Sequence, residues 1–177
     1  IPISIVVGGS YAKGTLVKKE MYDVDILLRY GMDYAKDKNK SLSDFSEPII
    51  KEISKKLNIK YEKAHGSRDY FRLFVMENAV FELIPVLKIS KPSQEKNVMD
   101  LSYFHVAYGK KHAKGLEDEI RLAKTFCKAQ GVYGAESYIH GFSGYALECL
   151  VIYYKSFVKM LNSLSGVKEQ IIVDSAK

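Results

Sequence analysis

A glycine-serine turn is the first stretch of this sequence whose residue types suit chemistry. Gly8, Gly9 and Ser10 follow an apolar run, Ile3 to Val7, that has the composition of a β-strand. Glycines let the backbone approach a ligand closely and leave its N–H groups accessible. Together with the Ser10 hydroxyl and Lys13, such N–H groups suit a triphosphate. The turn therefore predicts a phosphate-binding loop.

Two acids, Asp23 and Asp25, lie one residue apart where the next predicted strand, Val24 to Tyr30, begins. Because side chains alternate along a strand, both carboxylates point to the same side. Adjacent carboxylates repel each other unless a cation lies between them, and oxygen ligands favour Mg²⁺ or Mn²⁺ over zinc. The pair therefore predicts a divalent-metal site.

The composition indicates a globular protein with a basic surface. Of 177 residues, 47% are hydrophobic, which argues against disorder, and the net charge of +6 suits a polyanionic partner such as nucleic acid. Many solvent-exposed lysines would give the same charge balance.

Cys127 and Cys149 lie in helical patterns, which indicates buried thiols in a reducing compartment. No signal peptide or bilayer-length apolar run is present, so we expect a cytoplasmic protein without a membrane partner.

Periodicity places the acids in a mixed α/β domain. Residues 31–46 read as an exposed loop, and the apolar residues of Asp44 to Leu57 have helical spacing, with Pro48 suited to a first turn. Three further strands are expected at Ile59 to Lys63, Phe71 to Met76 and Ala79 to Ile89, with a tight turn between the last two.

Glu82 lies among apolar residues on the last of these strands. A glutamate buried alone would be costly, so it requires a cation or a hydrogen-bond partner. The alternative is a solvent-facing glutamate on an edge strand, which the neighbouring Pro85 would tolerate.

The second half of the chain reads as helical after a polar boundary at Lys91 to Asn97. Leu116 to Gln130 forms an amphipathic helix, and the helical pattern alone would leave Lys124 in solvent. A long apolar helix is expected from Gly141 to about Leu161. The lysine-rich stretch Tyr108 to Lys114 suits either an RNA-backbone contact or a solvated loop.

The order of these motifs resembles the DNA polymerase β-like nucleotidyltransferase superfamily, whose signature is a glycine-serine turn followed by Asp-x-Asp on the next strand. The sequence motif GGSYAKGT, at residues 8–15, resembles the archaeal-type (class I) CCA-adding enzymes of tRNA. The second half is similar to them too, at Glu-x-Arg-Leu-x-Lys, at Val-Tyr-Gly-Ala-Glu and at Gly-Phe-Ser-Gly-Tyr. The resemblance implies a mixed α+β fold with three parts. These are a catalytic head with a mixed sheet at 1–92, a helical nucleotide-binding neck at 93–165, and the start of a third domain at 166–177.

The resemblance also assigns roles to individual residues. The implied catalytic carboxylates, which would hold two Mg²⁺ or Mn²⁺ ions, are Asp23, Asp25 and Glu82. The implied nucleotide-binding residues are Gly9, Ser10, Lys13, His105, Lys124 and Tyr133. The chain departs from the usual family pattern at Glu82, normally Asp, and at Leu101 and His140, both normally Arg.

The implied reaction is template-independent addition of C, C and A to the 3′ end of tRNA. In it the RNA hydroxyl attacks the α-phosphate of CTP or ATP in line, and pyrophosphate leaves. The expected partners are the tRNA 3′ end, CTP and ATP, with a homodimer as the candidate assembly. Two alternatives stay open: a nucleotidyltransferase acting on another RNA or on a protein, and a non-catalytic RNA-binding relative.

Overall fold

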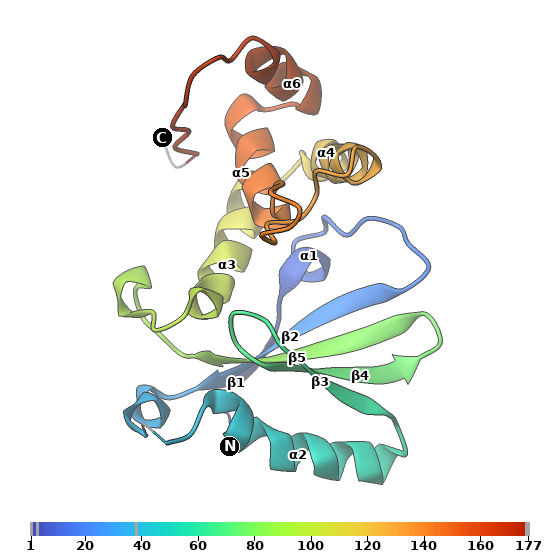
Figure 1. The fold of residues 1–177 in the computed structure, drawn as a ribbon, viewed down its shortest axis with the longest axis vertical. Coiled ribbons are helices and arrows are strands. Elements are labelled where there is room, and N and C mark those ends of the chain that lie inside the picture. Colours follow the sequence, from blue (N-terminus) through green and yellow to red (C-terminus); the bar gives the residue numbers. More distant parts are fainter. Residues whose placement is uncertain (1, 3, 38, 176–177) are drawn as a thin grey trace. The chain divides into compact units, whose positions relative to one another are not determined.

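The computed structural model describes residues 2, 4–37 and 39–175, so Ile3 of the first predicted strand lies outside the described residues. The chain folds into two compact units (Figure 1). Unit 1 comprises 1–12 and 18–106, and unit 2 comprises 13–17 and 107–177. The division thus falls after Val106, later in the chain than the predicted boundary after residue 92. In addition, segment 13–17, directly after the glycine-serine turn, belongs to the helical unit 2.

Unit 1 is built on a five-stranded mixed sheet, which confirms the predicted fold class. Its strands are β1 (Ser4–Val7), β2 (Tyr22–Tyr30), β3 (Tyr61–Ala64), β4 (Tyr70–Met76) and β5 (Ala79–Leu87). They lie in the order β1-β2-β5-β4-β3. The β2 and β5 strands run parallel, while the other neighbouring pairs are antiparallel. The strands that carry the acids therefore lie side by side inside the sheet.

Helix α2 (Leu42–Leu57) lies along one face of this sheet (Figure 1). The core beneath it is made by buried residues that include Leu28, Tyr30, Ile50, Phe71 and Leu83. Within it the Tyr30 hydroxyl lies 2.7 Å from Ser46 Oγ. The opposite sheet face carries a smaller cluster of Leu27, Ile84 and Val86. Successive β2 residues alternate between these two faces, so the face away from α2 is the one that displays Asp23 and Asp25.

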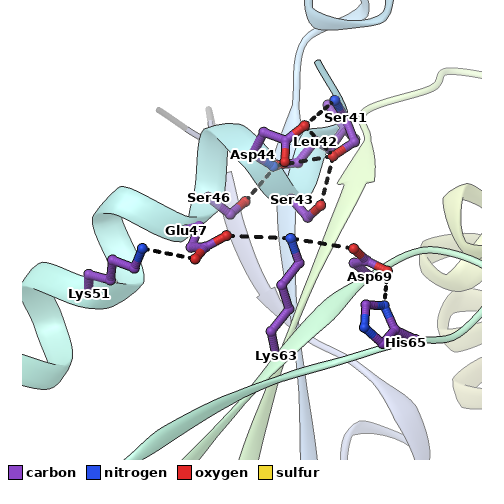
Figure 2. A network of polar contacts seen from close by, with 10 residues as sticks. All are labelled: Ser41, Leu42, Ser43, Asp44, Ser46, Glu47, Lys51, Lys63, His65 and Asp69. Atoms are coloured by element: carbon purple, nitrogen blue, oxygen red, sulfur yellow. Dashed lines mark hydrogen bonds and ion pairs between the residues drawn. The ribbon is translucent and has the colours of Figure 1, made fainter. Parts of the chain in front are cut away.

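Helix α2 begins earlier than predicted because Ser41 caps it (Figure 2). The Asp44 N–H donates to Ser41 Oγ at 3.3 Å, and the Ser41 N–H donates to the Asp44 carboxylate at 2.8 Å. This reciprocal pair satisfies two backbone donors at the helix start. Pro48 consequently lies inside the helix, not in its first turn as predicted.

Polar side chains join α2 to β3 (Figure 2). The Lys63 ammonium lies 3.4 Å from a carboxylate oxygen of Glu47 and 3.4 Å from one of Asp69. Glu47 also pairs with Lys51 at 3.0 Å, and His65 Nδ1 lies 2.8 Å from Asp69. Because these groups are partly or fully solvated, each pair contributes little to stability.

Short 3-10 turns fill the connections in unit 1. Region 31–46, predicted to be a loop, contains η1 (Met32–Lys36) as well as the start of α2. The polar boundary stretch contains η2 (Pro92–Gln94), and η3 (Val98–Leu101) follows it. Asp100 is buried and accepts hydrogen bonds from Arg68 at 2.5 Å and from the Leu87 N–H at 2.8 Å. This contact fixes the chain as it leaves the sheet.

Unit 2 contains α4 (Glu117–Ala129), α5 (Gly144–Tyr154) and α6 (Phe157–Ser165). Helix α3 (Ser102–His112) crosses the division between the units, so most of the lysine-rich stretch at 108–114 is helical and not a loop. The core of unit 2 includes Ile120, Val151, Phe157 and Met160. The long helix predicted to reach residue 161 is instead two helices. Lys155 has a left-handed φ of 62°, and Ser156 caps α6.

No helix among the described residues has the length and apolar character needed to cross a membrane.

Replacing Ser41 with alanine should lower the free energy of unfolding by about 1 kcal/mol, because the N-terminal cap of α2 is lost. Ser41→Asp is the matched control, since its carboxylate can still accept the Asp44 N–H. Urea denaturation of the three proteins measures the difference. Equal midpoints for wild type and Ser41→Ala would show that the cap contributes nothing.

Candidate active site

The predicted glycine-serine turn lies directly against β2, the strand that carries Asp23 and Asp25. After β1 the chain makes one helical turn, α1 (Gly9–Ala12), in which the Ala12 N–H donates to the Gly8 carbonyl at 3.1 Å. The Gly8 N–H donates to the Asp25 carbonyl at 2.8 Å. Gly9 has a φ of +57°, and a Cβ there would lie 1.5 Å from Asp25 Oδ2. The Asp25 carboxylate therefore occupies the place where any other residue at position 9 would put its side chain.

The sheet brings the three predicted carboxylates together. Asp25 of β2 is directly opposite Glu82 of β5, and Asp23 lies on the same face of β2. The Glu82 side chain is 19% exposed. Burial, followed by the negative charges of Asp23 and Asp25, raises the pKa of Glu82 to about 7. Because β5 has neighbours on both sides, the alternative of Glu82 on an edge strand is wrong.

Two bases compensate part of this negative charge. Arg72 of β4 is opposite Glu82, with Nε 3.4 Å from Glu82 Oε1 and Nη2 3.9 Å from Asp23 Oδ1. At these separations Arg72 forms loose ion pairs and no aligned hydrogen bond. Lys19 pairs with Asp23. Sequence reasoning missed Arg72, although its place between Phe71 and Leu73, which face α2, indicates that it points to the side of the acids.

The donor set suits a hard divalent cation. Carboxylate oxygens are the ligands that Mg²⁺ and Mn²⁺ prefer, and a cation would relieve the repulsion that raises the Glu82 pKa. Within 2, 4–37 and 39–175, no three His, Cys, Asp or Glu side chains already stand as a cluster that could enclose a metal. The bases Arg72 and Lys19 hold part of the compensating charge instead. The residues of this site thus fit divalent-metal chemistry by type and charge.

Lys124 is buried within unit 2, although the helical pattern alone would leave it in solvent. It is 3% exposed and donates to Glu148 Oε1 at 2.7 Å and to Thr15 Oγ1 at 3.1 Å. The Lys13 ammonium lies 2.6 Å from Glu148 Oε2, in contact without an aligned hydrogen bond. Both lysines that the resemblance assigns to the nucleotide therefore contact one buried carboxylate.

Burial and ion pairing shift the pKa values of Lys124 and Glu148 in opposite directions. Burial lowers the pKa of Lys124, and Glu148 partly offsets this effect. Burial acts to raise the pKa of Glu148, but the nearby Lys13 and Lys124 outweigh it and lower that pKa below its usual value. Glu148 is therefore a carboxylate held ionised inside the unit.

Tyr133 lies close to Lys124. A Cβ on Gly144, at the start of α5, would be 2.7 Å from Tyr133 Oη and 3.7 Å from Lys124 Cε. The Lys128 ammonium lies 4.9 Å from the centre of the Tyr133 ring. Unit 2 thus brings together Lys124 and Tyr133, two of the residues that the resemblance assigns to the nucleotide, with a glycine leaving room between them.

The remaining predicted site residues belong to unit 1. Ser10 is half-buried in α1, and His105 is half-buried in the first half of α3. Their contact with a nucleotide stays a prediction.

Glu148 is a second functional candidate, after Arg72, that sequence reasoning missed. The signal was present, because Glu148 is the single charge in the apolar helix α5 and a buried carboxylate requires partners. Its partners come from segment 13–17 and from α4, which no local pattern identifies.

Comparison with known proteins gives relatives along nearly the whole chain. The CCA-adding enzyme of Nanoarchaeum equitans is 42% identical over 173 residues, which are 98% of this chain and 41% of that protein. The CCA-adding enzyme of Saccharolobus shibatae is 35% identical over 175 residues, covering 97% of this chain and 40% of that protein. The chain spans about two fifths of the length of these curated relatives. These matches confirm the resemblance predicted from the motifs.

A family model described as the second domain of tRNA nucleotidyltransferase matches residues 118–177. The match lies within unit 2. It also includes 166–177, so the third domain expected there stays a prediction.

Solved structures share the fold at low identity. The Elizabethkingia meningoseptica CdnE cyclic dinucleotide synthase has a TM-score of 0.60 at 16% identity, covering 91% of this chain and 67% of that one. Terminal uridylyl transferase 4 of Trypanosoma brucei has a TM-score of 0.58 at 16% identity, covering 85% of this chain and 44% of that one. These neighbours confirm the predicted fold class.

Affinity for Mn²⁺ should fall about tenfold between pH 8 and pH 6, because a proton on Glu82, whose pKa is about 7, competes with the cation. Only the ionised carboxylate binds the metal, so affinity is lost as the pH decreases through 7. Electron paramagnetic resonance of free Mn²⁺ measures the binding. Glu82→Gln should bind Mn²⁺ weakly with little pH dependence, while Glu52→Gln on α2, whose exposed side chain pairs with Lys56 away from the acids, should behave as wild type. A wild-type affinity that is constant over this range would contradict the assignment.

Replacing Gly9 with alanine should weaken Mn²⁺ binding at least about tenfold, because the new methyl group displaces the Asp25 carboxylate. Gly14→Ala is a matched control. Gly14 also has a positive φ, +70°, but the nearest atom to its Cβ would be 3.8 Å away. Both variants place alanine at a left-handed φ, so equal losses of Mn²⁺ affinity would show that backbone strain, not contact with Asp25, is responsible.

Proposed function

We propose, from the kinship of this chain with the archaeal-type CCA-adding enzymes, that it carries the nucleotidyl-transfer site of a tRNA nucleotidyltransferase. The proposed reaction adds C, C and A to the 3′ end of tRNA without a template, with CTP and ATP as substrates. The observation that carries the proposal is the meeting of Asp23, Asp25 and Glu82 on adjacent strands beside the glycine-serine turn. The relatives named CCA-adding enzyme supply the substrate class.

The three carboxylates would hold Mg²⁺ or Mn²⁺, with two ions as the proposed number. Bound divalent ions supply positive charge that stabilises the attacking and leaving oxygens of a phosphoryl group. The accessible backbone of the turn and the Ser10 hydroxyl would bind the β and γ phosphates and so orient the leaving group. Gly9 allows that close approach because it has no side chain.

The chemical step is a single displacement. A lone pair of the RNA 3′ hydroxyl oxygen forms a bond to the α-phosphorus, the bond from that phosphorus to the bridging oxygen breaks, and pyrophosphate leaves with the electron pair. The hydroxyl proton passes to solvent. No covalent enzyme intermediate is required, so the contribution of the protein is positioning and electrostatic stabilisation.

The residues of unit 2 would contribute to nucleotide binding. Lys13 and Lys124 together carry one positive charge more than Glu148 neutralises, which favours an anionic ligand. Tyr133, whose hydroxyl lies near the Lys124 side chain, would contact the nucleotide beside it. His105 of unit 1 would contact the bound nucleotide as well. A homodimer and a cytoplasmic location stay predictions.

Asp25→Asn should reduce nucleotide addition at least about a thousandfold, because it removes a metal-binding charge at the site of transfer. The measurement is extension of a tRNA lacking its CCA end, and of one ending in CC, with each triphosphate and Mg²⁺. Ordered addition of C, C and A by wild type and its loss in Asp25→Asn would support the proposal.

Addition of nucleotides to any RNA without order would favour a transferase with another substrate. Triphosphate binding without transfer would favour a non-catalytic relative. Near-normal extension by Asp25→Asn would overturn the assignment of the carboxylates.

A further inference from the structure

We infer that Glu148 is a positioning residue, which fixes the chain directly after the glycine-serine turn by holding residues 13–15 onto α4 and α5. The inference rests on the proposed function, because the turn matters only if it binds a triphosphate. It concerns a residue that neither the motifs nor the resemblance singled out.

Several contacts hold residues 13–15 within unit 2. The Thr15 hydroxyl donates to Glu148 Oε1 at 2.8 Å, and Lys124 donates to Thr15 Oγ1 at 3.1 Å. Arg121 of α4 donates to the Gly14 carbonyl. Thr15 is fully buried, and Glu148 is 1% exposed. A short loop segment is therefore fixed by buried polar contacts that include a charged group, and such contacts are among the stronger ones in proteins.

Lys13 is confined from several sides. Its ammonium contacts Glu148 and lies 5.6 Å from the centre of the Tyr145 ring. Its stem passes Gly109 of α3, where a Cβ would come 2.6 Å from Lys13 Cδ. Gly109 thus leaves the space that the stem occupies. The direction of Lys13 is set by residues of α3 and α5, with Glu148 as the one anion in contact with its ammonium among the described residues.

Glu148 is the carboxylate shared by both buried lysines. Without its charge, two buried ammonium groups would lose the carboxylate that they share. The cost of burying them would then be relieved by loss of a proton or by movement of the lysines into solvent. The Lys13 stem is packed against Gly109, and Lys13 lies two residues before Thr15, so movement of Lys13 would disturb the backbone that Thr15 anchors. Loss of the carboxylate should therefore release residues 13–15 as a group.

The effect should reach the turn along the chain. Lys13 follows Ala12, the last residue of α1, without any intervening linker. A mobile segment at 13–15 would leave the turn at Ser10 held at one end only. The expected consequence is weaker triphosphate binding, while Mn²⁺ binding by the carboxylates of β2 and β5 is retained.

The test compares Glu148→Gln and Thr15→Val with two matched controls. Thr15→Ser keeps the hydroxyl that Thr15→Val removes. Glu119→Gln removes another carboxylate of unit 2, which accepts the Phe157 N–H at 2.6 Å; among the described residues it has no hydrogen bond or ion pair with segment 13–17. Thr15→Val preserves the shape of the side chain and all charges, so it tests the anchoring of residues 13–15 even if Glu148→Gln does not fold.

The first measurement is amide hydrogen exchange of a peptide spanning 9–17. Exchange should be at least about tenfold faster in Glu148→Gln and Thr15→Val than in wild type and the controls. Unchanged exchange in both folded variants, or an equal increase in Glu119→Gln, would overturn the inference. This measurement needs no substrate, so it decides about the anchor even if the proposed function fails.

The second measurement is binding and turnover of CTP with Mg²⁺, with Mn²⁺ affinity as an internal reference. The dissociation constant and KM for CTP should rise about tenfold in Glu148→Gln, with kcat and Mn²⁺ affinity nearly unchanged. A merely structural role would instead lower the active fraction at constant KM. Wild-type binding of CTP with no change in the variants would overturn the positioning role and leave the proposed function intact.

Discussion

The repulsion between carboxylates on neighbouring strands is the constraint on which unit 1 depends. The parallel register of β2 and β5 places Asp25 opposite Glu82, and a shift of one residue would send either side chain toward α2. The buried residues under α2 secure that register, because the same shift would expose them. The apolar core on one face thus holds a charge arrangement on the other face that would not be stable by itself.

Much of unit 1 could be predicted from the sequence because its signals are local. Alternation in β2 placed both aspartates on one face, and the glycine turn preceded them in the chain. The start of α2 was missed because the helix was located by the spacing of its apolar residues, whereas Ser41 and Asp44 cap it through polar side chains. The boundary at residue 92 differs from the division after Val106 because α3 runs through it without a break in helical pattern.

The site in unit 2 could be predicted only in part, for a physical reason. Lys124 lies on α4 in a helical pattern that indicates solvent, but its burial depends on Glu148, which is distant in the sequence. Likewise, the break at Lys155 requires a left-handed backbone, which is uncommon for a lysine and carries no sequence signature. The environment of such a residue depends on a partner distant in the sequence, so it can be recognised only once the fold has placed that partner.

The path of segment 13–17 has a consequence for the order of events during synthesis. Thr15 leaves the ribosome long before its partner Glu148, which lies 133 positions later. The sheet of unit 1 has all its strands by residue 87, so it can form while the chain still grows. Closing so long a loop is entropically costly and slow. A nascent chain would therefore carry its acids in place before the segment after its glycine-serine turn is anchored, so that segment would stay mobile until α5 has emerged.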